Sequence, residues 1–248
     1  MGTVTITVVC DNYSVKNDLQ TGHGFACHVA GLEKTILFDT GWSGLALREN
    51  MQKLGFSFAD VDVLVLSHMH GDHTGGVGAV IGSGSPLTIY LPGAVPARFK
   101  QEISVSGNKL IETQEADEIC PGAWTTGVLK AGLQEHALCV ETDRGPFVIT
   151  GCAHPGIDNM ASEAGEICGF PVYGVLGGFH LSAAGSGSIE GIIEELREMG
   201  VEAVAPCHCS GNNARGIFKK AYGENYYGAG VGWKLELQKE GTDQSNSQ

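Results

Sequence analysis

The pattern of hydrophobic and polar positions predicts a chain in which short strands and amphipathic helices follow one another. Residues 61–66, Val-Asp-Val-Leu-Val-Leu, are mostly apolar and β-branched, which is typical of a buried strand. Similar runs predict further strands at residues 4–9, 26–30, 34–38, 87–91, 137–141, 147–150, 172–176, 203–205 and 230–237. Apolar residues at helical spacing predict helices at residues 45–54, 75–81, 188–199 and 212–221. This mixture of elements is typical of an α/β fold.

Two stretches depart from this pattern. Residues 92–127 mix short polar runs with Pro, Gly and Trp124, and we expect them to form an excursion over the mouth of a site. Residues 238–248 are polar, and we expect a disordered tail there. No linker interrupts the rest of the chain, so residues 1–237 are predicted to fold as a single domain.

Composition narrows the classes of partner. The 248 residues are 42% hydrophobic and 17% charged, as in an ordinary globular chain. The net charge of −13 argues against a nucleic-acid partner, which would need a basic face, and against an anionic membrane surface. No apolar run reaches the length of a membrane span, and the N-terminus lacks a basic targeting region. The eight scattered cysteines favour reduced thiols and a cytoplasmic protein. We therefore expect a small-molecule substrate, while a homo-oligomer stays open.

The most informative segment follows the strand at residues 61–66. Residues 66–76 read Leu-Ser-His-Met-His-Gly-Asp-His-Thr-Gly-Gly and contain His68, His70, Asp72 and His73. Imidazole is the commonest protein ligand of zinc and similar metals, and carboxylate is a harder companion ligand. Residues two apart in an extended segment point the same way, so His68 and His70 can bind one metal. After the turn at Gly71, Asp72 and His73 can reach a second one.

Later strands end in histidines as well. The predicted strand at residues 147–150 leads to His154, and the one at residues 203–205 leads to His208. Because sites of α/β proteins are built where strands end, we expect both histidines to join the metal site. His180 follows a third strand, and we expect it to face the substrate or to lie behind the ligands.

These motifs resemble those of the metallo-β-lactamase superfamily. The run from His68 to His73 matches its H-x-H-x-D-H signature, and residues 36–41, Ile-Leu-Phe-Asp-Thr-Gly, are similar to the strand and turn beneath the site. The resemblance spans residues 4–233 and implies a four-layer αββα sandwich. Residues 151–159, 177–181 and 208–211, together with Asp11-Asn12 and Gly22-His23-Gly24-Phe25, resemble the 7,8-dihydropteroate synthase-like, methanopterin-pathway subgroup.

The resemblance implies one or two metals and leaves part of the ligand set open. In the favoured arrangement, His68, His70 and His154 hold one metal, and Asp72, His73 and His208 hold the other. Cys152 stands where many members carry a bridging Asp, so it is an alternative thiolate ligand. His136 is a further alternative, although we favour a strand-edge role for it. Cys207 and Cys209 flank His208, and we expect them to point away from the site as packing residues.

The implied activity is hydrolysis. Two divalent ions, zinc or else manganese or iron, would provide hydroxide near neutral pH. Asp72 would also orient the nucleophile or pass a proton to the leaving group, and His180 would bind the substrate or donate a proton. A small soluble ester, in particular a phosphoester, is the expected substrate. The alternatives are a lactone or another carboxylic ester, a pterin transfer of the dihydropteroate synthase type, and an iron-dependent oxidation.

Overall fold

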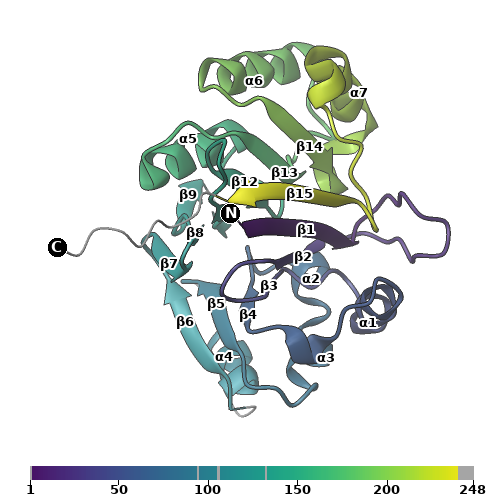
Figure 1. Cartoon of the computed structure of the whole chain (residues 1–248), viewed down its shortest axis with the longest axis vertical. Helices are drawn as coiled ribbons and strands as arrows, with labels where there is room; N and C mark the ends of the chain where they lie inside the picture. Colours follow the sequence, from purple (N-terminus) through teal and green to yellow (C-terminus); the bar gives the residue numbers. More distant parts are fainter. Residues whose placement is uncertain (1, 94, 105–106, 132, 240–248) are drawn as a thin grey trace.

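Two β-sheets pack face to face at the centre of the structure, and helices cover both outer faces (Figure 1). The computed structural model describes residues 2–93, 95–104, 107–131 and 133–239. The first sheet has the order β15 (Lys234–Lys239), β1 (Gly2–Cys10), β2 (Ala26–Ala30), β3 (Ile36–Phe38), β4 (Val63–Val65), β5 (Thr88–Pro92) and β6 (Lys109–Thr113). The second sheet has the order β14 (Ala203–Cys207), β13 (Gly174–Gly178), β12 (Phe147–Thr150), β11 (Leu138–Val140), β8 (Ala123–Thr125) and β7 (Asp117–Cys120).

Side chains alternate between the two faces of each strand, and this alternation explains how the sheets and helices pack in layers. On β4, Val63 and Val65 face the core between the sheets, while Leu64 faces the helices outside. On β12, Phe147 and Ile149 face the same central core. The first sheet is covered by α1 (Gly44–Lys53), α3 (Val77–Ile81) and α4 (Ala97–Ser104), and the second by α5 (Ile157–Cys168), α6 (Ser186–Glu198) and α7 (Gly211–Tyr222). The predicted four-layer αββα sandwich is therefore confirmed.

The direction of the strands brings the predicted site residues together. The segment from β3 to β6 is parallel, and so is the segment from β12 to β14. The carboxyl ends of parallel strands meet at one edge of a sheet. The histidine loop after β4, which includes the short helix α2 (Gly71–Thr74), and the loops after β12, β13 and β14 therefore lie at the same edge of the sandwich.

The stretch of residues 92–127 differs from the expectation of an irregular excursion over the site mouth. It contains α4 and the strands β6, β7 and β8. Strand β6 is the edge strand of the first sheet, and β8 and β7 extend the second sheet to its edge at β7. Strands β6 and β7 are largely exposed on one side, so polar residues occupy them and no hydrophobic run marks them. A small hairpin, β9 (Leu129–Ala131) and β10 (Leu133–Glu135), leads from β8 back to the site.

Two further differences concern helix α5 and the C-terminus. The pattern at residues 157–168 did not predict α5, because Ala161 and Ala164 fill two of its four buried positions and give a weak hydrophobic signal. The expected tail begins two residues too early, because Gln238 and Lys239 pair with Thr3 and Gly2 of β1. Residues 240–248 of that tail lie outside the described residues. Within the described part of the chain, no helix is both long and apolar enough to cross a bilayer.

Buried His28 should make stability depend on pH. It is 4% exposed and stacks on Phe56 with 4.1 Å between ring centroids, and burial lowers its pKa to about 4. The unfolded chain binds a proton at His28 from about pH 6.5, so stability falls as the pH falls from there through the folded pKa. At pH 5 this amounts to about 2 kcal/mol. Urea unfolding of metal-free protein at pH 7.5 and pH 5 should show this extra loss in the wild type and not in His28→Gln. Equal losses in both proteins would contradict it.

Candidate metal centre

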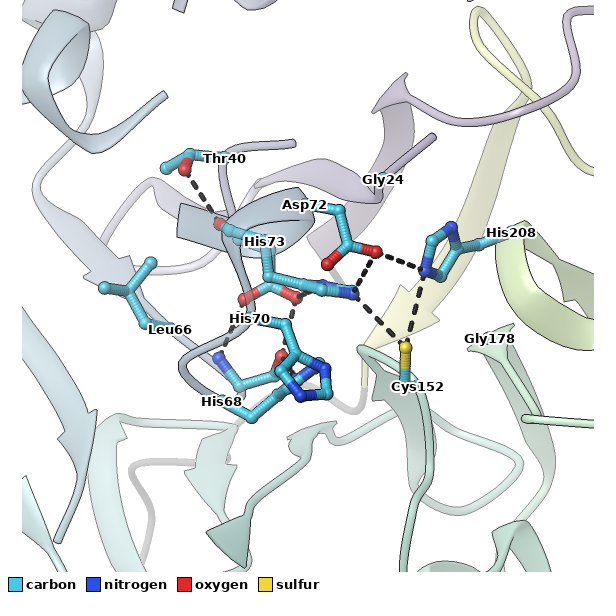
Figure 2. Close-up of polar contacts among 12 residues, drawn as sticks. Gly24, Thr40, Leu66, His68, His70, Asp72, His73, Cys152, Gly178 and His208 are labelled. Carbon is cyan, nitrogen blue, oxygen red and sulfur yellow. Dashed lines mark hydrogen bonds and ion pairs between the residues drawn. The ribbon is translucent and has the colours of Figure 1, made fainter. Parts of the chain in front are cut away.

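The loop after β4 is held in place by a buried carboxylate. Asp39, at the end of β3, accepts hydrogen bonds from the backbone N–H of Ser67 and from its hydroxyl, each at 2.7 Å. Burial raises the pKa of Asp39 to about 7. The chain then turns into α2, which begins after His70 and carries Asp72 and His73. This local geometry directs the side chains of the loop towards the second sheet (Figure 2).

The structure places His68, His70 and His154 together as a first group of donor atoms. His68 Nε2 lies 3.1 Å from His70 Nδ1. One ligand atom from each of the three residues lies within 4.8 Å of the others. His68 is fully buried, whereas His70 is exposed to solvent and His154 is half-buried. This group therefore opens to the surface on the side of His70.

A second group surrounds Asp72. Its Oδ2 atom lies 3.6 Å from His73 Nε2 and 3.4 Å from His208 Nε2. Cys152 Sγ is 3.3 Å from His73 Nε2 and 3.4 Å from His208 Nε2, so the thiol lies between the two rings (Figure 2). All six predicted ligands, and Cys152 with them, thus lie at one edge of the sandwich.

Hydrogen bonds on the far ring nitrogens orient the histidines. His73 Nδ1 lies 2.7 Å from Asp39 Oδ2, His154 Nδ1 lies 2.7 Å from Glu135 Oε2, and His208 Nδ1 lies 2.9 Å from Asn12 Oδ1. An Nδ1–H that donates to such an oxygen leaves the Nε2 lone pair free, which is the form that binds a metal.

Glu135 is the central support of the loop after β12. Its side chain is fully buried and accepts four hydrogen bonds, from the backbone N–H groups of Cys152, Ala153 and His154 and from His154 Nδ1, at 2.7 to 2.9 Å. Burial alone would raise the pKa of Glu135, but these hydrogen bonds and the nearby His68 outweigh it and lower the pKa to about 2. The carboxylate is therefore ionised at neutral pH.

The electrostatics of the site favour a bound cation. Burial lowers the pKa of His68 to about 3 and that of His73 to about 4, so both rings are neutral at pH 7. Burial would raise the pKa of Asp72, but the proximity of His208 and His73 holds it well below its usual range. Neutral imidazoles beside ionised carboxylates are the protonation states that metal ions require.

Backbone strain is concentrated around this site. Among the described residues, the non-glycine positions with positive φ are Asp39, Ala153, His180 and His208, with φ between 47° and 57°. Each comes shortly after a strand that ends at the site. Such conformations persist where the surrounding structure holds them in place and are common at functional sites.

The structure also places four further residues that the sequence had singled out. His136 lies outside both donor groups, because its Nε2 donates to the carbonyl oxygen of Leu66 at 2.7 Å and its Nδ1 lies 2.5 Å from Thr125 Oγ1. His180 is exposed, and its ring centroid lies 4.5 Å from that of His154. Cys207 packs in the central core as expected. The expectation for Cys209 was wrong: the positive φ of His208 turns the chain, and Cys209 Sγ approaches Cys152 and His180.

Sequence reasoning did not assign a role to Asn12, Glu135 or His23. Asn12 and His23 belong to motifs of the subgroup, which was the available signal for them. Glu135 belongs to no recognised motif. The only signal for it in the sequence was a carboxylate close to a predicted strand. His23 lies in the loop between β1 and β2, and its Nε2 is 3.1 Å from Asp72 Oδ2.

Comparison with known proteins agrees with this geometry. The family model described as the metallo-beta-lactamase superfamily matches residues 27–208. The 7,8-dihydropterin-6-methyl-4-(beta-D-ribofuranosyl)-aminobenzene-5'-phosphate synthase of Methanocaldococcus jannaschii is 27% identical over 90% of this chain and 93% of its own length. The crystal structure of Tm1679, a metal-dependent hydrolase of the beta-lactamase superfamily, is similar with a TM-score of 0.79 and 29% identity, covering 95% of this chain and 99% of that one. A diphosphatase of the PhnP family shares the fold at a TM-score of 0.61 and 13% identity, over 95% of this chain and 97% of its own.

Proposed function

Because this chain belongs to the metallo-beta-lactamase superfamily and has its enzyme fold, we propose that it is a metal-dependent hydrolase of small esters, with a phosphoester as its substrate. The observation that carries the proposal is the pair of donor groups at one edge of the sandwich. In the proposed arrangement, His68, His70 and His154 hold one divalent ion. Asp72, His73 and His208 hold the second, and we propose zinc for both, with manganese or iron as the alternatives to be tested.

The spacing of the donor atoms supports this assignment. Ligand atoms at about 2.0 to 2.1 Å from a tetrahedral zinc ion lie roughly 3.3 Å apart. The pair His68 Nε2 and His70 Nδ1, at 3.1 Å, and the pair Asp72 Oδ2 and His208 Nε2, at 3.4 Å, have this separation. Cys152 Sγ has it too, at 3.3 Å from His73 Nε2, so a thiolate ligand at this position stays compatible with the second metal. Nitrogen, carboxylate and thiolate donors together suit zinc.

The metals and the side chains around them would have different roles in the reaction. Bound divalent metal supplies hydroxide at neutral pH and polarises the oxygen of the scissile group. We propose that the Asp72 carboxylate orients the attacking water and passes its proton towards the leaving group. His180 stands exposed beside His154 and is proposed to contact the substrate on that side. Asp39, Glu135 and Asn12 keep the metal-binding rings in place.

A second candidate function follows from the archaeal relative. Its printed name describes a synthase whose product carries a 5'-phosphate, and the similarity covers nearly the whole of both chains. On this alternative the site would assist the transfer of a pterin group from a leaving diphosphate, and water would not be the nucleophile. The phosphate in the printed name of this relative is why we propose a phosphoester rather than a lactone.

The test is a comparison of generic substrates. Protein loaded with zinc, and in parallel with manganese or iron, should hydrolyse bis(p-nitrophenyl) phosphate at least about tenfold faster than a simple lactone, as judged by kcat/KM. Metal analysis of the same samples should find two equivalents per chain. Faster turnover of the lactone would contradict the phosphoester proposal. Turnover of neither substrate by fully loaded protein would favour the synthase.

A further inference from the structure

The loop between β1 and β2 carries His23, which belongs to neither proposed ligand set. Its ligand atom nevertheless lies within 4.8 Å of those of Asp72 and His208, so its role has to be decided from its hydrogen bonds. The side chain of His23 is 69% exposed, and its Nε2 lies 3.1 Å from Asp72 Oδ2. Its ring centroid lies 5.0 Å from that of His208. His23 therefore stands on the open side of the second donor group, next to the carboxylate that is proposed to serve the reaction.

The backbone around His23 is tightly constrained. A Cβ atom added at Gly22 would lie 2.3 Å from the ring of Trp42, and one added at Gly24 would lie 2.3 Å from the carbonyl oxygen of Asp72. Gly24 also has a φ of +147°, which disfavours any other residue. The next backbone N–H, that of Phe25, donates to the same carbonyl oxygen of Asp72 at 3.3 Å. The loop is thus fastened to the turn that carries Asp72, and His23 has a defined position.

Asn12 determines which nitrogen of His23 carries the hydrogen. Its Oδ1 accepts from the backbone N–H of Gly24 at 3.1 Å, and a backbone N–H can only donate, so this contact identifies the oxygen. Asn12 Oδ1 also lies 2.9 Å from His208 Nδ1, which must then be a donor. The amide nitrogen of Asn12 lies 3.3 Å from His23 Nδ1, so that ring nitrogen is the acceptor. A neutral histidine whose Nδ1 accepts a hydrogen bond carries its hydrogen on Nε2.

The same amide group therefore gives two neighbouring histidines opposite tautomers. His208 has its Nε2 lone pair free for a metal, whereas His23 presents an Nε2–H. We propose that His23 is not a metal ligand but a hydrogen-bond donor that binds a phosphoryl oxygen of the substrate beside Asp72. This inference rests on the proposed function in one respect only, the phosphorylated nature of the ligand.

The surroundings favour a substrate oxygen as the acceptor. Asp72 Oδ2 also faces His73 Nε2 and His208 Nε2, so a cation held by these residues competes with His23 for that oxygen. The exposed N–H of His23 is then free for an oxygen of the bound ligand. Its side chain reaches solvent, as a group that meets an incoming anion must. The chain has a net charge of −13, which repels an anionic ligand. Hydrogen-bond donors beside the metals would offset this repulsion at the site.

The experiment uses inorganic phosphate as the probe and needs no turnover. Zinc-loaded wild type, His23→Ala and His23→Gln are titrated with phosphate by calorimetry, and the zinc content of each is measured. His23→Ala should bind phosphate about tenfold more weakly with unchanged zinc, because one hydrogen bond to a charged group is lost. His23→Gln keeps an N–H donor on a side chain of similar reach and should recover most of the affinity. His28→Gln, a histidine variant away from the site, should bind phosphate like the wild type.

A second measurement reads the tautomer directly. Long-range ¹H–¹⁵N correlation spectra of zinc-loaded protein at pH 7.5 should contain one Nε2–H tautomer signal that disappears in His23→Ala. Loss of zinc from His23→Ala, an Nδ1–H tautomer, or unchanged phosphate affinity would each overturn the inference. If wild type binds phosphate through His23 yet hydrolyses no phosphodiester, the proposed function fails while the role of His23 stands.

Discussion

Replacing His68 by alanine should lower the kcat/KM for bis(p-nitrophenyl) phosphate by a factor of about 10³ or more. His68 is fully buried at the centre of the first donor group, and its ring lies against those of His70, His73 and His154. Its removal leaves two donors for the first metal, which is too few to hold the ion. The attacking water then loses one of the two cations that would lower its pKa from the bulk value of about 15.7 towards about 7.

Steady-state kinetics and metal analysis by mass spectrometry check this expectation together. The metal content of His68→Ala should fall by about one equivalent per chain, with the far-UV circular dichroism of the wild type retained. His28→Gln provides the matched control, because His28 is buried but lies in neither donor group, and its metal content should not change. A His68→Ala protein that keeps both metals and most of its activity would remove His68 from the ligand set.

Replacing Glu135 by alanine should lower the free energy of unfolding by about 3 to 5 kcal/mol. The buried carboxylate is the acceptor for three backbone N–H groups, those of Cys152, Ala153 and His154. An unsatisfied buried donor costs about 1 to 3 kcal/mol, so the losses add to a large effect. The same substitution releases His154 Nδ1, so the first metal should also bind more weakly.

Urea unfolding of metal-free protein measures the first effect without the contribution of the metals. Zinc titration with a competing chelator measures the second, and we expect an affinity about 10- to 100-fold lower. Glu194→Ala, an exposed carboxylate on α6, is the control and should change neither quantity by more than about 0.5 kcal/mol. A Glu135→Ala protein as stable as the wild type would show that water or a rearranged loop satisfies the three N–H groups.

The hydrophobic pattern predicted the elements that carry the site well. Residues 61–66 are mostly apolar because β4, at Val63–Val65, is buried on both faces, between the central core and the helices. Because the hydrophobic run shows where such a strand ends, the histidines that follow it could be recognised as candidate site residues. The pattern failed at edge strands β6 and β7, where one face meets solvent, and at α5, where small residues pack closely against the sheet.

The residues that support the metal-binding rings could not be derived in this way. Glu135 and His154 are separated by 19 residues, and Asn12 and His208 by 196. Nothing in the local spacing around Glu135 or Asn12 indicates which ring nitrogen each will meet. The expectation that Cys209 points away from the site failed for a related reason, because it assumed an extended backbone where His208 has a positive φ.

The sequence by itself determined the superfamily of this protein and the candidate donor residues, through the H-x-H-x-D-H loop and the histidines after later strands. These features are local, since the types of donor atom and their order along the chain depend on a few adjacent residues. Only the tertiary structure decided which ring nitrogens of these histidines are engaged in hydrogen bonds. The packing of the two sheets brings Asn12 between His23 and His208 and Glu135 under His154. Because a histidine binds a metal or donates a hydrogen bond according to which ring nitrogen is already engaged, these long-range contacts distinguish the proposed ligands from the proposed substrate-binding residue.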